Sequence, residues 1–479
     1  MNNLSSCSIE KIHIEKLFGK FNYEIPNSTQ NENNDFSRIL ILYGDNGSGK
    51  TTILQIIYHL LSPISKKGHK TFIAKIPFKK FEIYLNNGIR IVAERKKKII
   101  GSFSLLIYKF DIKLISAEIL YDDTLKKIEY NKISIKEKTF TSREAIELDI
   151  NDDYESHQLE KKFLKQLSKL DIALYLLSDD REFESSIFEA SDDKSQVDYF
   201  LKRELRRFEE KLRREESDSS KMLSKEMRNL ILRQAILRVE KYIMDQVNKA
   251  SIKSELNINK IYSAITKNII ISSENYIRTK KDLTNVILKL EDLSNRSKIY
   301  SSFGLIAPID NEEIIKNIEK ASKNNYNVLL NVLEPYIDGL SAKLDTFQSI
   351  YEMLNTFTNY INKFYTNKKI EYDTSKGFII KSDNDIIDFT LLSSGEKQLL
   401  LLFCNAFQTL EQPTIFIIDE PEISLNIRWQ RELIHALLAL TENSHVQFIL
   451  ATHSIELLNQ YRDHTIKLIT ENTGNQNDG

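Results

Sequence analysis

The chain has 479 residues and a formal net charge of −1, from 67 Lys and Arg against 68 Asp and Glu. This length favours two to three domains, or one domain with large insertions. The balanced charge excludes an overall electrostatic attraction to nucleic acid, so any such contact must be a local patch. The two cysteines, Cys7 and Cys404, exclude a disulfide framework and a cysteine-based metal site, and they indicate a reducing compartment.

The N-terminal residues carry no signal for export. They lack the charged-then-apolar layout of a signal peptide, and no apolar run in the chain approaches the roughly 18 residues that span a bilayer. We therefore expect a cytoplasmic protein that makes no membrane contact.

Three short runs near the start have the patterns of β-strands. Residues 9–17 and 21–25 alternate apolar and polar side chains, as half-buried strands do, and residues 38–43 read RILILY, a buried strand. A glycine-rich loop follows at Gly44, and apolar positions at helical spacing then continue up to Pro63. Strand, loop and helix in this order are the context that a phosphate-binding loop requires.

The middle of the chain changes from strand to helix patterns. Residues 72–135 offer several short strand candidates with a turn signal, NNG, at 86–88, which predicts antiparallel strands beside the phosphate site. No Gly or Pro occurs from Ser102 to Phe303, so long helices are free to form there. Charged and apolar residues alternate at helical spacing over residues 195–300, which indicates an antiparallel helical arm or, alternatively, a compact helical insertion.

The C-terminal part returns to mixed patterns. More helix is expected after Pro335 as far as Tyr365, and strand character then resumes. The last few residues have the composition of a disordered tail.

The loop from Gly44 to Thr51 fits the phosphate-binding pattern G-x-x-x-x-G-K-[ST]. In this pattern backbone N–H groups surround the phosphates, the lysine reaches the β and γ oxygens, and the last hydroxyl binds magnesium. Lys50 and Thr51 are the residues that would fill these two roles. The expected nucleotide-binding residues are Gly44, Asn46, Gly47, Ser48, Gly49, Lys50, Thr51 and Thr52.

A second candidate lies near the other end of the chain, where four apolar residues, Ile415 to Ile418, lead into Asp419 and Glu420. A strand that carries two acids to a phosphate site has this pattern. Asp419 would hold magnesium and Glu420 would polarise the attacking water. The alternative interpretation is an acidic turn after a core strand.

Two further stretches complete the set. Residues 391–402 read LLSSGEKQLLLL, a small-residue turn that opens an apolar helix, so that the helix N-terminus and the Ser393 hydroxyl could face an anion. A plain N-cap is the alternative. Downstream, an apolar strand ends in Thr452-His453-Ser454, where the histidine is either functional or structural.

In this order the motifs resemble those of the ATPases of the ABC superfamily. They match its Walker A (44–51), its signature (392–396), its Walker B (415–420), a D-loop around Ser424-Leu425-Asn426 and its switch histidine, His453. Lys50 and Ser393 are 343 residues apart (393 − 50), which is similar to the branch with long helical insertions.

The resemblance implies an α/β fold, an ABC-type P-loop ATPase head with a mixed sheet, an antiparallel β patch and a long helical or coiled-coil insertion. The N-terminal lobe would span residues 1–190, the insertion 191–365 and the C-terminal lobe 366–479. It also implies ATP and Mg²⁺, and two heads of a homo-oligomer that sandwich the nucleotide. Glu420 and His453 would be catalytic, Thr51 and Asp419 would bind Mg²⁺, and the signature residues Ser393, Ser394, Gly395 and Glu396 would act on the partner's ATP.

More narrowly, both head lobes resemble the bacterial antiphage-defence ATPases, such as the sensor subunits of PARIS and Septu systems, with an OLD-like head that has no Toprim domain. Two features depart from that pattern. Members often have His where this chain has Asn426. No Gln lies between Gln55 and Gln158, so a standard Q-loop is missing, and Asp179 or Asp180 would substitute for it.

This resemblance implies a slow, switch-like ATPase that serves as sensor or scaffold, holding a toxic, nuclease-like effector encoded nearby and releasing it upon a phage-derived trigger. The alternative is a RecF-like or chromosome-maintenance-like ATPase that clamps DNA through basic residues, for which only 94–98 and 203–214 are candidates. A self-contained nuclease is disfavoured, because only 26 residues (479 − 453) follow His453.

Overall fold

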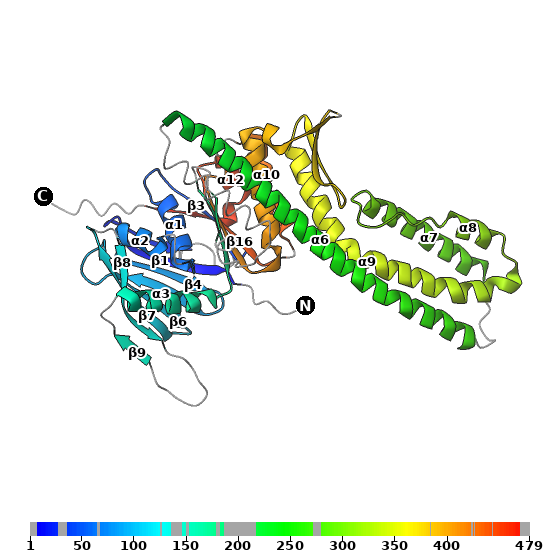
Figure 1. The fold of residues 1–479 in the computed structure, drawn as a ribbon, viewed down its shortest axis with the longest axis horizontal. Helices are drawn as coiled ribbons and strands as arrows, with labels where there is room; N and C mark the ends of the chain where they lie inside the picture. Colours follow the sequence, from blue (N-terminus) through cyan, green and yellow to red (C-terminus); the bar gives the residue numbers. More distant parts are fainter. Residues whose placement is uncertain are drawn as a thin grey trace. The chain divides into compact units, whose positions relative to one another are not determined.

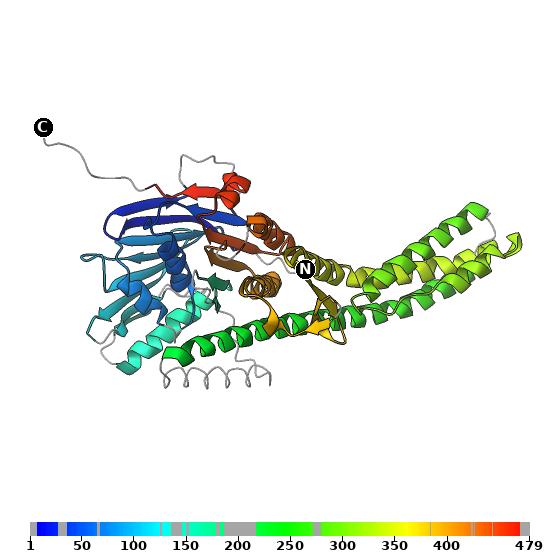
Figure 2. The same cartoon turned by 90° about the horizontal axis from the view of Figure 1, so that it is seen from above.

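The computed structural model describes residues 7–26, 36–64, 68–124, 127–135, 146–149, 153–178, 183–185, 217–271, 279–383, 385–422, 425, 427–442 and 444–469. The chain divides into two compact units, residues 1–200 with 409–479 and residues 201–408, and each is described by itself. Figures 1 and 2 show the ribbon from two sides. The lobe boundaries expected from the sequence stay a prediction.

The first unit contains an eight-stranded antiparallel sheet in the order β2-β1-β4-β5-β6-β7-β8-β9. The predicted antiparallel strands of residues 72–135 are confirmed, and β1 and β2 extend them at one edge. Gly88 has a φ of 78° in the turn between β4 and β5, a conformation that favours glycine. The strands are β1 (Ile9–Leu17), β2 (Phe21–Ile25), β4 (Lys80–Leu85), β5 (Ile89–Glu94), β6 (Phe103–Lys109), β7 (Ile112–Asp122), β8 (Lys127–Ile135) and β9 (Ile146–Asp149).

The same unit holds a six-stranded sheet in the order β11-β10-β15-β16-β3-β17. All neighbours pair in parallel except β11, which is antiparallel to β10. Strands β10, β15 and β16 are buried along their whole length, which explains their unbroken apolar runs. The strands are β3 (Ile39–Tyr43), β10 (Ala173–Leu177), β11 (Phe183–Ser185), β15 (Thr414–Asp419), β16 (Val446–Ala451) and β17 (Thr465–Lys467).

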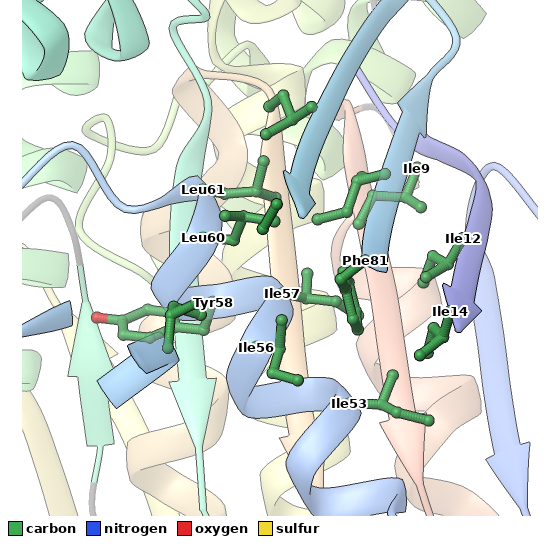
Figure 3. Close-up of a cluster of buried hydrophobic side chains, with 14 of the residues drawn as sticks. Ile9, Ile12, Ile14, Ile53, Ile56, Ile57, Tyr58, Leu60, Leu61 and Phe81 are labelled. Atoms are coloured by element: carbon green, nitrogen blue, oxygen red, sulfur yellow. The ribbon is translucent and has the colours of Figure 1, made fainter. Parts of the chain in front are cut away.

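Helix α1 (Lys50–Leu61) occupies the core of this unit. Its apolar side chains join one cluster with residues of both sheets, among them Ile12 and Ile14 of β1 and Phe81 of β4 (Figure 3). Burial on nearly all sides holds the helix that follows the glycine-rich loop rigidly in place. The other helices of the unit are α2 (His69–Lys75), α3 (Asp153–Ser168), α11 (Ile427–Leu440) and α12 (Ile455–Gln460), with 3₁₀ turns at Thr409–Glu411 and Arg462–His464.

The second unit is mainly helical. It consists of α6 (Ser217–Ile271), α7 (Lys280–Ser301), α8 (Glu312–Glu319), α9 (Tyr326–Phe364) and α10 (Ser394–Gln408), with the three-stranded sheet of β12 (Lys368–Asp373), β13 (Gly377–Ser382) and β14 (Asp385–Ile387). Short 3₁₀ turns lie at Lys323–Asn325 and Phe389–Leu391. The expected long helical insertion is present in this unit.

Helix α6 has 55 residues, so its axis is about 82 Å long. It runs alongside α9, as Figures 1 and 2 show, and the side chain of Ile261 on α6 lies against Gly339 on α9. A Cβ at Gly339 would lie 1.9 Å from Ile261 Cδ1, so any larger residue there would force the Ile261 side chain to move. The sequence analysis placed an antiparallel helical arm within residues 195–300. The main partner of α6 is instead α9, which lies outside this range.

The helix expected after Pro335 as far as Tyr365 is confirmed as part of α9, which starts earlier, at Tyr326, and continues through the proline to Phe364. Proline removes one helical hydrogen bond and tends to break a helix. Here Leu330 and Ile337 are buried on either side of it, so packing against the neighbouring helices holds both halves in one helix.

Candidate nucleotide-binding site

The glycine-rich loop joins the buried strand β3 to α1, as the sequence predicts. Gly47 and Gly49 have φ values of 81° and 92°, in the left-handed region that favours glycine. A Cβ at Gly49 would also lie 2.9 Å from Leu17 Cδ2, at the end of β1. The backbone conformation therefore favours glycine before Lys50, and a larger residue would also displace the Leu17 side chain.

Lys50 is the first residue of α1 and is only 6% exposed. Its Nζ donates to the carbonyl oxygens of Gly44, at 2.8 Å, and Asp45, at 3.3 Å. Burial lowers the pKa of Lys50, and the nearby carboxylates of Glu420 and Asp419 oppose this shift. The amino group therefore lies inside the loop, which is where the motif requires a cation.

The remaining predicted loop residues surround this lysine. Asn46 and Gly47 are exposed at the tip of the loop, and Ser48 is buried, with its carbonyl oxygen accepting a 2.8 Å hydrogen bond from Tyr23 Oη on β2. Thr51 and Thr52 are half-buried in the first turn of α1. Tyr23 has no signal in the sequence that marks it as part of the site, and its hydrogen bond ties the loop to the antiparallel sheet.

The predicted acids lie beside this lysine. Strand β15 ends at Asp419, which is 3% exposed, and Glu420 follows it with a φ of 49°. The backbone N–H of Glu420 donates to the Ala451 carbonyl oxygen at 2.9 Å, so the last residues of β15 and β16 hold the turn. Both carboxylates oppose the lowering of the Lys50 pKa by burial, which favours the functional interpretation over a plain acidic turn, and the roles of the two acids stay predictions.

Glu420 has an unusual protonation equilibrium. Burial raises the pKa of its carboxyl group to about 8, and the hydrogen bond and charge of Glu422 and the charge of Asp419 add to this shift. Lys50 opposes it. A carboxylate with such a pKa accepts a proton more readily than an ordinary glutamate, as a general base must.

His453 lies next to Glu420, although 33 residues (453 − 420) separate them. Its Nε2 is 3.4 Å from Glu420 Oε1, and its side chain is exposed at the end of β16. The structure thus brings together both residues that the sequence predicts to be catalytic. Because β15 and β16 are parallel neighbours, their carboxyl ends meet at one edge of the sheet.

Glu422 was missed by the sequence reasoning. Its Oε1 accepts hydrogen bonds from Thr452 Oγ1 at 2.5 Å, the His453 backbone N–H at 2.8 Å and the Ser454 backbone N–H at 2.9 Å. This one oxygen holds the loop that carries His453. The only signal in the sequence is an acid two residues after Glu420, which has no periodicity to mark it.

The residues expected to bind Mg²⁺, Thr51 and Asp419, fit that role by their chemistry. Mg²⁺ binds hydroxyl and carboxylate oxygens, usually one or two protein carboxylates together with waters and substrate phosphates. The crowding of Asp419, Glu420 and Glu422, which raises the Glu420 pKa, is relieved by a cation. In the part of the chain that is described, no group of three or more His, Cys, Asp or Glu side chains holds a metal by itself, and this binding mode needs none.

The signature residues lie in the second unit, at the start of α10. The Ser393 backbone N–H donates to Glu396 Oε2 at 2.7 Å, and the Glu396 N–H donates to Ser393 Oγ at 3.3 Å, which is a capping box. Lys368 Nζ lies 3.0 Å from Glu396 Oε1. Ser393 and Ser394 are exposed, whereas Gly395 and Glu396 are buried. The N-cap interpretation is therefore confirmed, and the action of these residues on a partner's nucleotide stays a prediction.

Some predicted residues lie outside the described part of the chain. These are the D-loop residues Ser424 and Asn426, the proposed Q-loop substitutes Asp179 and Asp180, the basic run 203–214 and the C-terminal tail 470–479. Leu425, between the two D-loop residues, is buried. Within the described residues, no helix combines the length and apolar character needed to cross a bilayer.

The parallel strand β3 leads into a glycine-rich loop and a buried helix, and an acid pair ends β15, which is separated from β3 by β16 alone. This arrangement defines a P-loop ATPase head, here of the ABC type with a long helical insertion. The chain belongs to the AAA ATPase domain family, whose family model matches residues 11–458. It is therefore an ATPase that binds and hydrolyses ATP.

Two curated relatives are similar over part of the chain. The "Retron Vc95 probable ATPase" of Vibrio cholerae serotype O1 biovar El Tor is 27% identical over 205 residues, which cover 38% of this chain and 37% of the relative. The "Retron Ec83 probable ATPase" of Escherichia coli is 27% identical over 206 residues, covering 40% and 33%. The matched stretches thus span about a third of the length of these relatives.

Solved structures with similarity include the Smc head domain with an extended coiled coil bound to the C-terminal domain of ScpA from Pyrococcus furiosus. It has a TM-score of 0.35 and 13% identity, with 95% of this chain and 92% of that chain covered. The SMC head domain from Thermotoga maritima has a TM-score of 0.30 and 12% identity, with the same coverage. These scores are too low to bear on fold or function, which rest on the strand topology and the family match.

Proposed function

We propose that this ATPase is the sensor or scaffold of a bacterial antiphage defence system and that it holds and releases a toxic effector protein. The observation that carries the ATPase part is the convergence of Lys50, Glu420 and His453 at the ends of three neighbouring parallel strands. The defence part rests on the resemblance of the head motifs to the PARIS and Septu sensor ATPases. Two relatives are named as probable ATPases of retrons, which supports a role as one component of a larger system.

In the proposed reaction, Lys50 leaves the Gly44 and Asp45 carbonyl oxygens and binds the β and γ oxygens of ATP. Glu420, whose pKa is raised by burial and by its carboxylate neighbours, accepts the proton of the attacking water. His453, 3.4 Å from Glu420, orients this carboxylate and contacts the γ-phosphate side of the site. A magnesium ion held by Thr51 and Asp419 would supply the positive charge that phosphoryl transfer requires.

The switch would operate through closure of two heads. Ser393 and Gly395 of one chain complete the site of the other, so ATP favours a closed homodimer or a larger assembly built from such dimers. The nucleotide can bias a bound effector only by its differential affinity for the open and closed states. Slow hydrolysis would then time the return to the open state. The helices α6, α7 and α9 are the proposed docking elements, because long helices with apolar and charged faces suit partner helices.

The test is coexpression with the protein encoded next to this chain. We expect a stable complex that is toxic only with a phage trigger, and toxicity that is lost in the Lys50→Ala and Glu420→Gln variants. The Glu420→Gln variant is expected to bind ATP without hydrolysing it, so loss of toxicity in this variant would show that hydrolysis, and not ATP binding alone, is required. Robust magnesium-dependent DNA cleavage by the isolated chain, or full phage protection in a strain that lacks all neighbouring genes, would overturn the proposal.

The alternative function is a RecF-like or chromosome-maintenance-like ATPase that acts on DNA. The observation that favours it is a group of exposed lysines near the nucleotide site, described below. This alternative predicts that single- or double-stranded DNA stimulates ATP hydrolysis of the isolated chain and that no neighbouring gene is needed for its effect in cells. An ATPase rate unchanged by both forms of DNA argues against it.

A further inference from the structure

Three loops of the first unit are joined by backbone hydrogen bonds next to the glycine-rich loop. They are the loops that follow β1, α2 and β5, each taken together with the end of its element: residues 15–20, 75–79 and 94–101. The Phe18 N–H donates to Pro77 O at 2.7 Å, and the Phe78 N–H donates to Ile99 O at 2.7 Å. Two further bonds, Lys79 N to Glu15 O and Arg95 N to Lys79 O, are both 2.9 Å long. The three loops therefore form one continuous surface.

This surface is strongly basic. Its two acids, Glu15 and Glu94, are half-buried, and Glu15 lies 3.5 Å from His13. Among the described residues, no acid lies within ion-pair distance of any of its exposed lysines, whereas Lys80 and Lys11 of the same sheet pair with Glu82 and Glu24. The exposed lysines, here called the lysine surface, are Lys16, Lys20, Lys75, Lys79, Lys96, Lys97 and Lys98.

Arg95, which belongs to the basic run 94–98, has a different role. It is 5% exposed, and its guanidinium donates to the carbonyl oxygens of Phe78 at 3.0 Å and Ile73 at 2.8 Å. It also lies 4.0 Å from the centre of the Phe78 ring. Arg95 therefore fixes the loop from inside, so that the three lysines after it are held at the surface before any ligand binds.

An aromatic ring lies among the lysines. Phe18 is 40% exposed at the tip of the β1–β2 turn, and Ile100 is 47% exposed on the third loop. Lys16 and Lys20 flank Phe18 in this turn, and the Lys20 ammonium lies 4.6 Å from the centre of the Phe21 ring. Proteins bind single strands with such a combination of lysines and an exposed aromatic ring, with phosphates on the cations and a base on the ring. The lysine ammonium is a point charge, whereas the arginine guanidinium forms paired, directional hydrogen bonds. Lysines therefore suit contacts with the phosphate backbone that do not depend on base sequence.

We propose that the lysine surface binds single-stranded nucleic acid, with its phosphates on the seven lysines and one base stacked on Phe18. An acidic protein would also be attracted to the lysines, but it has no need of the exposed ring. The proposal goes beyond the effector-holding function and does not depend on it, because binding is expected of the isolated, nucleotide-free chain. Phe18 also touches the glycine-rich loop, since its Cε2 lies 3.3 Å from the position of a Cβ on Gly49.

The test is fluorescence anisotropy with a fluorescein-labelled single strand of twenty thymidines and the full-length chain, at several salt concentrations. We expect the triple variant Lys96→Glu, Lys97→Glu, Lys98→Glu to bind at least tenfold more weakly. For a single strand, the slope of the logarithm of the binding constant against the logarithm of the salt concentration is about −0.7 for each phosphate contact. Loss of three contacts should therefore reduce the magnitude of this slope by about 2. Phe18→Ala should weaken binding several-fold and leave the slope unchanged.

The matched control is Lys161→Glu, Lys162→Glu, Lys165→Glu, which reverses three exposed lysines on α3 of the same unit. This variant should bind like the wild type, and far-ultraviolet circular dichroism of all variants checks that they are folded. Equal weakening by the two triple variants, or wild-type binding by the first, would refute the proposal. A third result would also refute it: polyglutamate competes as effectively as the unlabelled single strand, and Phe18→Ala has no effect. The surface would then bind an acidic protein.

Discussion

Glu422 is expected to control turnover, because it holds the loop of His453 in place. The perturbation is Glu422→Ala, which removes the oxygen that accepts three hydrogen bonds from Thr452, His453 and Ser454. In a partly exposed site each of these bonds contributes about 1 kcal/mol net, so about 3 kcal/mol of positioning is lost. If this loss falls on the transition state, kcat falls on the order of 10²-fold, at 1.36 kcal/mol for each factor of ten.

The second variant, Glu422→Gln, separates positioning from charge. Both substitutions remove the negative charge that helps to raise the pKa of Glu420, but only Gln keeps an oxygen that can accept the three bonds. The difference in kcat between the two variants therefore reports the positioning of His453 alone. We expect Glu422→Gln to retain at least tenfold more activity than Glu422→Ala.

The assay is steady-state ATP hydrolysis together with binding of a fluorescent ATP analogue. Nucleotide affinity should change less than threefold, because Lys50 and the glycine-rich loop remain intact. Glu432→Ala, which changes an exposed acid on α11, is the control and should behave like the wild type. The reasoning fails if Glu422→Ala and Glu422→Gln have the same kcat, or if the loss appears in nucleotide affinity instead of turnover.

Three further predictions concern the other site residues. Lys50→Ala should lower ATP affinity at least a hundredfold, because it removes the cation among the β and γ oxygens, and undiminished binding of labelled ATP would contradict its assignment. Glu420→Gln should bind ATP normally, hydrolyse it at least a hundredfold more slowly and accumulate a closed dimer in size-exclusion chromatography; a wild-type rate would show that another group is the base. Ser393→Arg should bind ATP but not hydrolyse it, and mixing it with Lys50→Ala should restore some activity, unless the sites are not shared between chains.

Local patterns predicted the parts of the fold that depend on nearest neighbours in the sequence. The apolar runs of β3, β15 and β16 are buried on both faces of the sheet, and such runs are visible without a structure. The glycine-rich loop was predicted for the same reason, because its backbone conformation is set by its own glycines. The juxtaposition of Glu420 and His453 followed only from the family resemblance.

Contacts between distant residues could not be predicted in this way. Glu422 acts on residues 30 to 32 positions further along the chain, and Arg95 looks like one more surface cation in a basic run until its four carbonyl partners are seen. Pro335 is a helix breaker by local chemistry, and only packing of α9 overrides it. In each case tertiary structure decides between local alternatives that have similar free energies.

The two interpretations of Ser393, an N-cap and a contact for a partner's nucleotide, are compatible in this structure. Its Oγ accepts only a long hydrogen bond, 3.3 Å, from the Glu396 N–H, so its own proton remains available as a donor. Burial alone would raise the pKa of Glu396, but hydrogen bonds from Ser393 and Lys368 lower it, which keeps the carboxylate charged and the turn closed. The capping box thus holds the exposed serine at the N-terminus of α10 in one orientation. A partner's phosphate arriving there would meet a preorganised donor and a helix N-terminus at no further cost in ordering the turn.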